Sequence, residues 1–169
     1  MAGKISYRNL PQLFLKAREE LMCHFRPILN HFGLTEQQWR ILRTLSESEQ
    51  LEPREICEAC HILSPSLAGV LARMEDMGLV QRTRMAEDQR RVLVRLAPKG
   101  EKLVTEVAPL VEQQYRNLEQ ALGPNLVAEI YKVLDRVLQT QRESVERVDI
   151  KAKRPRKAGT PSRAKSAAA

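Results

Sequence analysis

The stretch from Glu52 to Leu96 constrains the fold more than any other, because two short helical patterns are followed there by two strand-like runs. The second helical pattern opens with Ser64 and Pro65, a hydroxyl cap and then a proline, as helix N-termini favour. Its apolar residues recur at helical spacing and are Leu67, Val70, Leu71 and Met74. Gly78 then supplies a left-handed helix stop. A helix–turn–helix followed by a β-ribbon is a winged helix, which predicts nucleic-acid binding.

The distribution of charge supports the same prediction. Residues 151–169 contain seven basic residues and no acidic one, so they account for the whole net charge of +7 and leave residues 1–150 formally neutral. Within that neutral body, residues 79–99 carry six basic side chains against Glu87 and Asp88. A basic wing on an otherwise acidic domain is a better indication of nucleic-acid binding than the high isoelectric point.

The cellular compartment is indicated mainly by features that the sequence lacks. Charged residues interrupt the N-terminal apolar pattern, so no signal peptide is expected. No uncharged run approaches the ~20 residues of a membrane span. Three cysteines, an odd number, favour free thiols in a reducing compartment. We therefore expect a cytoplasmic protein that does not associate with a membrane.

Long apolar helical patterns flank the winged helix at about 9–31, 98–122 and 126–138. Pro27 predicts a kink or break in the first of them. The fold class expected is mainly α with a small β-wing, in which the flanking helices make a homodimer that reads two half-sites. Completion of a monomeric bundle is the alternative. The expected division is a helix at 1–34, a winged helix–turn–helix at 35–97, dimerisation helices at 98–148 and a disordered basic tail at 149–169.

Three motifs carry a family resemblance: Glu75-x-x-Gly78-Leu79-Val80, Asp88-x-Arg90-Arg91 and Leu96-x-x-x-Gly100. With the order of the helices, they resemble the MarR family of dimeric transcriptional regulators. The run Leu34-Thr35-Glu36-Gln37-Gln38-Trp39-Arg40 is similar to the subgroup that controls homoprotocatechuate degradation. The resemblance implies a homodimeric repressor of aromatic-catabolism genes. Such a repressor is expected to bind a palindromic operator in double-stranded DNA and to be released by a small aromatic or heteroaromatic carboxylic acid.

Residues of the second helix and of the wing are the candidates for DNA contact. Small side chains on the exposed helix face let the backbone enter the major groove, and an arginine can reach phosphate or guanine. Arg90, near the hairpin tip, suits the minor groove, with Asp88 orienting it; a solvated surface pair is the alternative. Ser64 is favoured as a helix cap over a base contact. The full set is Ser64, Pro65, Ser66, Ala68, Gly69, Arg73, Arg84, Asp88, Arg90 and Arg91.

The candidate effector site combines arginines with apolar and aromatic residues. Arg18 shares a helix face with Met22 and Phe25, where an unpaired guanidinium favours a carboxylate ligand. The alternative is an ion pair with Glu20, or with Glu19 of a neighbouring chain. Trp39 would form an aromatic wall, and Arg40 and Arg43 are the alternative anchors. In the family, effectors bind between the dimer helices and the DNA-binding lobe.

The cysteines suggest rival interpretations. Cys57-x-x-Cys60-His61 matches haem c attachment, but export is not indicated. A structural zinc site would need further ligands. Some MarR relatives sense oxidants through a cysteine on the first helix, which makes Cys23 a redox candidate whose thiolate Arg26 can stabilise. An oxidant-sensing regulator therefore stays an alternative, as does a nonspecific nucleic-acid-binding protein.

Catalytic machinery is not evident in the sequence. No Ser/His/Asp arrangement, glycine-rich phosphate loop or histidine-rich cluster occurs, and His24, His31 and His61 are isolated from one another. We expect no enzyme activity, no cofactor and no metal.

Overall fold

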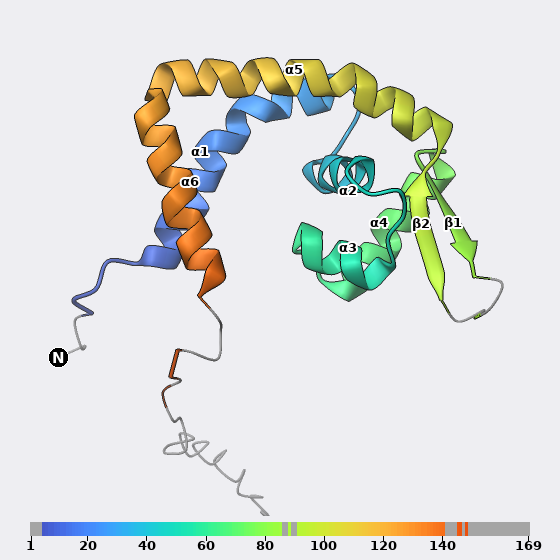
Figure 1. The fold of residues 1–169 in the computed structure, drawn as a ribbon, viewed down its shortest axis with the longest axis horizontal. Coiled ribbons are helices and arrows are strands. Elements are labelled where there is room, and N and C mark those ends of the chain that lie inside the picture. Colours follow the sequence, from blue (N-terminus) through green and yellow to red (C-terminus); the bar gives the residue numbers. More distant parts are fainter. Residues whose placement is uncertain (1–4, 86–87, 89–90, 141–144, 147, 149–169) are drawn as a thin grey trace, which may run out of the picture. The chain divides into compact units, whose positions relative to one another are not determined.

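The computed structural model describes residues 5–85, 88, 91–140, 145–146 and 148, and these are mainly helical with one antiparallel two-stranded sheet (Figure 1). This confirms the expected fold class. One compact unit reaches Pro124 and a second begins at Asn125. The elements are α1 Leu10–His31, α2 Glu36–Ser46, α3 Pro53–Cys60, α4 Ser64–Asp76, β1 Val80–Arg84, β2 Val92–Leu96, α5 Pro98–Leu122 and α6 Pro124–Gln139.

Helix α1 begins where the Asn9 side chain accepts a hydrogen bond from the backbone N–H of Gln12, at 3.0 Å. It continues through Pro27 to His31, so of the kink or break predicted at the proline, the break is wrong and the kink stays a prediction. A proline inside a helix removes a single backbone hydrogen bond. Phe25 and Leu29, on either side of it, are buried in the core and hold the helix together there.

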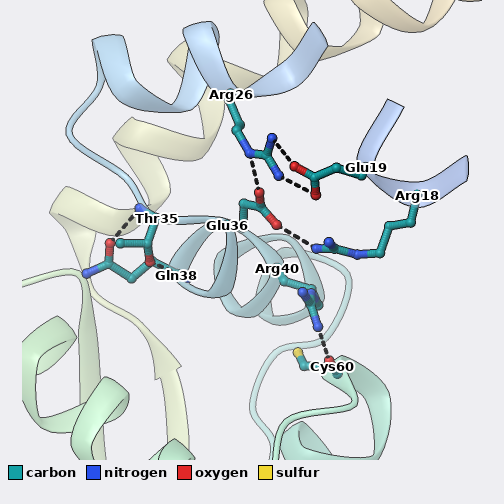
Figure 2. Close-up of polar contacts among 8 residues, drawn as sticks. All are labelled: Arg18, Glu19, Arg26, Thr35, Glu36, Gln38, Arg40 and Cys60. Carbon is teal, nitrogen blue, oxygen red and sulfur yellow. Dashed lines mark hydrogen bonds and ion pairs between the residues drawn. The ribbon is translucent and has the colours of Figure 1, made fainter. Parts of the chain in front are cut away.

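Helix α2 begins with a capping box, which the run Thr35-Glu36-Gln37-Gln38 predicts from the sequence. The Thr35 hydroxyl accepts from the backbone N–H of Gln38 at 3.2 Å, and the Gln38 side chain accepts from the Thr35 N–H at 2.9 Å (Figure 2). The inward face is formed by the fully buried Ile41, Leu42 and Leu45. The capping box therefore sets the start of the helix that lies at the centre of the winged-helix core.

Helix α4 differs from expectation at its first residue. Ser64 is already helical, Leu63 takes the capping position, and no side chain caps the helix. The Leu63 carbonyl accepts from the N–H groups of Ser66 and Leu67, at 2.9 and 3.1 Å. The Ser64 hydroxyl is thus not the cap, because its residue lies one position too late in the turn.

The wing is an antiparallel pair in which Val80 lies opposite Leu96 and Arg84 opposite Val92. Leu51 forms an isolated antiparallel β-bridge with Val94, and the two residues exchange two backbone hydrogen bonds, at 2.9 and 2.8 Å. These contacts attach the wing to the segment that leads into α3.

The corner between α4 and the wing is also the place where α5 begins. Gly78 ends α4 at φ +71°, and the Leu79 N–H bonds the Met74 carbonyl at 2.8 Å, a Schellman arrangement. A Cβ on Gly100, in the first turn of α5, would lie 2.1 Å from the Leu79 carbonyl oxygen. Lys99 donates to the Met77 carbonyl at 2.8 Å. Helix α5 therefore packs directly on the backbone between α4 and the wing.

Helix α6, described by itself, follows Gly123 with φ +85° and carries an apolar stripe without a buried residue. No helix in the described part of the chain is long and apolar enough to span a bilayer. The predicted tail at 149–169 lies outside the described residues.

Candidate nucleic-acid interface and effector site

The two faces of α4 differ completely in burial. The face toward the core is fully covered, whereas the opposite face is exposed and consists of Ser64, Pro65, Ser66, Ala68, Gly69 and Arg73. Arg73 folds toward Gly69, and its guanidinium lies 3.6 Å from the point where a Cβ on that glycine would stand. This face of α4 therefore carries small side chains and the cation Arg73, and its shape suits insertion into a DNA groove.

Four arginines of the wing and α4 fall into two classes. Arg82 on β1 forms an ion pair with Glu75 of α4, and Arg91 forms one with Glu52 before α3. In the described residues, Arg73 and Arg84 have no carboxylate partner. Their guanidiniums are therefore available to phosphates, whereas those of Arg82 and Arg91 already have an anion beside them.

The hairpin tip is only partly described. Arg90 lies outside the described residues, so its minor-groove role and its pairing with Asp88 remain predictions. At the base of the tip, the Arg91 N–H donates to the Asp88 carbonyl at 3.0 Å, and the Arg91 carbonyl accepts from Met85 at 3.1 Å. These bonds hold the backbone of Arg91 where the tip joins β2.

A four-residue ion-pair network joins α1 to the start of α2 (Figure 2). One Glu36 oxygen contacts Arg18 at 2.5 Å and the other contacts Arg26 at 2.7 Å, while Arg26 also contacts Glu19 at 2.6 Å. Burial opposes ionisation of Glu36, but the two arginines outweigh it and lower the pKa of that carboxyl. The hydrogen bond from Arg26 likewise lowers the pKa of Glu19.

This network corrects the expected surroundings of Arg18. Its guanidinium is not unpaired among apolar neighbours, and its partner is Glu36 rather than Glu20. The sequence gave no indication of this pair, because 18 positions separate the two residues. Within the network, two arginines and two glutamates balance in charge.

Arg40 also has a partner within the chain. It donates to the Cys60 carbonyl at 2.6 Å, at the C-terminal end of α3 (Figure 2). A cation at a helix C-terminus satisfies an exposed carbonyl and the helix dipole. Arg40 therefore ties α2 to α3, a structural task that the spacing alone did not reveal.

Trp39 and Arg43, one turn apart on α2, line a cavity of about 180 Å³. The Arg43 guanidinium lies 3.3 Å from a Glu47 oxygen and 3.4 Å from the Tyr115 hydroxyl. The Tyr115 ring is itself 4.8 Å from that of Phe25, between ring centroids. Opposite α2, the cavity is lined from α5 by Val104, Ala108, Val111 and Glu112.

The structure thus brings together part of the predicted effector set and adds to it. Trp39 and Arg43 lie at one cavity, Phe25 is buried behind Tyr115, and Met22 packs against the core. Arg18 and Arg40 are directed to Glu36 and to Cys60 instead. Tyr115 was missed as a site residue, although it is the one aromatic residue in the sequence of α5.

The cysteines are free thiols in different surroundings. Cys23 is exposed, and its sulfur lies 2.9 Å from the Glu20 carbonyl oxygen. The expected support from Arg26 is absent, since that guanidinium contacts Glu19 and Glu36. Cys60 is buried, with its sulfur 3.4 Å from the Thr44 hydroxyl. Among the described residues, no group of three or more His, Cys, Asp or Glu side chains could hold a metal.

Comparison with known proteins gives a consistent set of relatives. The MarR family model matches residues 34–92. The HTH-type transcriptional regulator FarR of Neisseria gonorrhoeae is 43% identical over 128 residues, 72% of this chain and 88% of FarR. The homoprotocatechuate degradative operon repressor of Escherichia coli is 37% identical over 127 residues, 75% and 86% of the two chains. A solved structure of NadR in complex with 4-hydroxyphenylacetate, 37% identical, has a TM-score of 0.71 and covers 83% of this chain and 100% of NadR.

Proposed function

The chain belongs to the MarR family of transcriptional regulators, and from this premise we propose that it is a homodimeric repressor. It binds a palindromic operator in double-stranded DNA and is released by a small aromatic or heteroaromatic carboxylic acid. The genes it controls serve the catabolism of aromatic compounds. Support for the last point comes from the relative named for homoprotocatechuate degradation.

The proposed DNA interface consists of the exposed face of α4 and the wing. The small residues of that face permit close approach to base edges, and Arg73 reaches phosphate or guanine. Arg84 contacts phosphate, and Arg90, oriented by Asp88, enters the minor groove. The single observation that carries this part is the exposed face of Ser64, Ser66, Ala68 and Gly69 on a helix whose opposite, apolar face is buried.

Dimerisation is supported by apolar residues that the described chain leaves exposed. Along the first half of α1 these are Leu10, Leu13, Phe14 and Leu21, with exposed fractions from 37 to 59%. Helix α6, taken alone, exposes Leu126, Ile130, Val133 and Val137. Such apolar surface on helices of regular pattern marks an interface, and a second copy of this chain covers it.

The effector cavity proposed is the one beside Trp39 and Arg43. A cavity of about 150 Å³ is known to hold a benzene molecule, so one of about 180 Å³ has room for a substituted ring. Arg43 is the carboxylate anchor, because Arg18 and Arg40 have short contacts elsewhere. Its own pair with Glu47 is long and exposed, and such pairs contribute only ~0–1 kcal/mol. The relative NadR, which binds 4-hydroxyphenylacetate, supports this ligand class.

The position of the effector cavity between α2 and α5 explains how a bound acid would release the operator. Helix α2 belongs to the DNA-reading lobe, whereas α5 begins after the wing and is followed in the chain by α6, which carries part of the proposed dimer interface. An acid bound between them favours one spacing of the two recognition helices in the dimer. If that spacing does not match the operator, a coupling of ~1–3 kcal/mol relieves repression.

The test measures operator release directly. An operator is first selected from random duplexes, and its complex is then titrated with 4-hydroxyphenylacetate, a hydroxynicotinate and, as matched control, 4-hydroxyphenylacetamide. Both acids or one of them should release DNA, and the uncharged amide should not. Arg43→Gln should bind the operator yet lose the response, whereas Arg18→Gln should keep it. Loss of the response in Arg18→Gln alone would move the anchor to Arg18, and release by the amide would remove the carboxylate requirement.

A further inference from the structure

We propose that Glu52 is a positioning residue for the wing: its carboxylate holds the Arg91 guanidinium and withholds that cation from DNA phosphates. Arg91 Nε donates to Glu52 Oε1 at 2.8 Å, and Nη2 contacts the same oxygen. The two residues lie 39 positions apart. The inference rests on the proposed DNA binding and concerns which wing arginine contacts the duplex.

Both ends of this ion pair are fixed by the backbone. Glu52 follows Leu51, which is hydrogen-bonded to Val94 of β2, and its own N–H donates to the Glu55 carboxylate at 2.7 Å. Arg91 is held on its side by the bonds to Asp88 and Met85 described above. An exposed ion pair between mobile side chains contributes little, since ordering them costs entropy. Here the backbone of each partner is already ordered, so the pair fixes the base of the hairpin tip against α3.

The ion pair between Glu52 and Arg91 also changes the charge that the wing offers to DNA. Guanidiniums bind carboxylates and phosphates through the same N–H groups. An arginine that is paired with Glu52 is therefore not available to the phosphates of the DNA backbone. The neighbouring Glu52 carboxylate raises the pKa of Arg91, and the guanidinium stays charged but locally neutralised. A similar ion pair holds Arg82 of β1 to Glu75 of α4. The wing therefore reaches the duplex with Arg84, and with Arg90 as proposed, while Arg82 and Arg91 hold its base.

The salt dependence of binding separates this role from direct contact. Each neutralised phosphate steepens the slope of log K against log salt by ~0.9. We expect Glu52→Gln to release Arg91 to a phosphate and steepen the slope by that amount. Between 50 and 200 mM salt this is an additional loss of about 3.5-fold. Affinity for nonspecific duplex should rise, and the ratio of operator to nonspecific affinity should fall because the wing is less well positioned.

The experiment uses the full-length chain and fluorescence anisotropy with an operator duplex and a scrambled duplex. The double variant Glu52→Gln with Arg91→Gln preserves net charge and should keep the wild-type slope. Glu106→Gln is the matched control, because it removes a carboxylate that pairs with Lys102 on α5, and its slope should also be unchanged. Thermal unfolding of each variant checks that it is folded.

Two results would overturn the proposal. One is a wild-type slope in a folded Glu52→Gln variant. The other is a slope shallower by ~0.9 in the double variant, which would mean that Arg91 contacts phosphate in the wild type. The double variant supplies this second measurement even if Glu52→Gln alone does not fold. A wild-type chain that binds neither duplex would be a different failure, since it would refute the proposed function and this inference with it.

Discussion

Helix α4 and the first half of α1 have the same kind of apolar repeat and opposite surroundings. In α4, Leu67, Val70, Leu71 and Met74 are exposed by 3% or less, whereas in α1 Leu10, Leu13, Phe14 and Leu21 keep 37 to 59% of their surface exposed. The change occurs within α1 itself, since Phe25 and Leu29 join the core. A helical repeat shows that a face favours burial, but it does not show which neighbour covers it.

The largest effect should come from the buried face of α4. Met74→Ala removes a fully buried side chain and should lower the free energy of unfolding by about 2–5 kcal/mol, independently of protein concentration. Leu21→Ala, the matched change on α1, should lower the free energy of unfolding mainly at protein concentrations at which the chain is dimeric. Urea unfolding at two concentrations measures both. An equal, concentration-independent loss in the two variants would remove the distinction between the helices.

The next effect concerns the junction between the winged helix and α5. Gly100→Ala places a methyl group 2.1 Å from the Leu79 carbonyl oxygen, and backbone cannot yield as a flexible side chain can. Overpacking of this kind costs about 1–3 kcal/mol. Thermal unfolding should show the loss, with Gly69→Ala as control because its nearest contact is the flexible Arg73 at 3.6 Å. A neutral Gly100→Ala would show that α5 can move away from the wing at little cost.

An effect of comparable size on DNA affinity, without one on stability, is expected from the two arginines proposed to contact DNA, Arg73 and Arg90. Arg90→Ala and Arg73→Ala should each weaken operator binding by about 1–3 kcal/mol. Arg73 is exposed, so its loss leaves no cavity in the core. Binding isotherms at ~0.15 M salt and melting curves for the same samples provide the comparison. Unchanged affinity in Arg90→Ala would take the hairpin tip out of the DNA contact.

The smallest effect should come from the network between α1 and α2. The pKa of Glu36 is lowered in the folded chain, so its ionisation contributes stability above the unfolded pKa of ~4.3, and that stability is lost as pH falls through the folded value. Glu36→Gln should therefore cost up to ~1 kcal/mol at pH 7 and progressively less on acidification. Urea unfolding at pH 7 and pH 4 tests this. A cost that grows on acidification would contradict the assignment.

The residues predicted to bind the effector show how far the sequence could place side chains together, although their role in binding stays a prediction. Trp39 and Arg43 were selected from their types and neighbourhood, and both line one cavity. Arg18 was the preferred carboxylate anchor, because an arginine among apolar residues on one helix face favours an anion. Its anion proved to be Glu36, which follows the turn between α1 and α2. Helical periodicity describes one element, and it does not describe what the next element places against it.

The sequence by itself determined the local elements of this protein. The Thr35–Gln38 capping box, the stop at Gly78 and the two strands of the wing each depend on residues a few positions apart, and the structure confirms all three. Their order was enough to identify a winged helix. Local hydrogen bonding and backbone preference act before the chain folds, so they can be recognised without it.

Tertiary structure alone decided which arginines pair with residues far away in the sequence. Arg91 meets Glu52 across 39 positions, and Arg43 meets Tyr115 across 72. Several arginines and glutamates in this sequence are equivalent in type, and any of them can form an ion pair. Which ones do depends on the packing of α1, α2, α5 and the wing, because charged groups interact strongly only at contact distance.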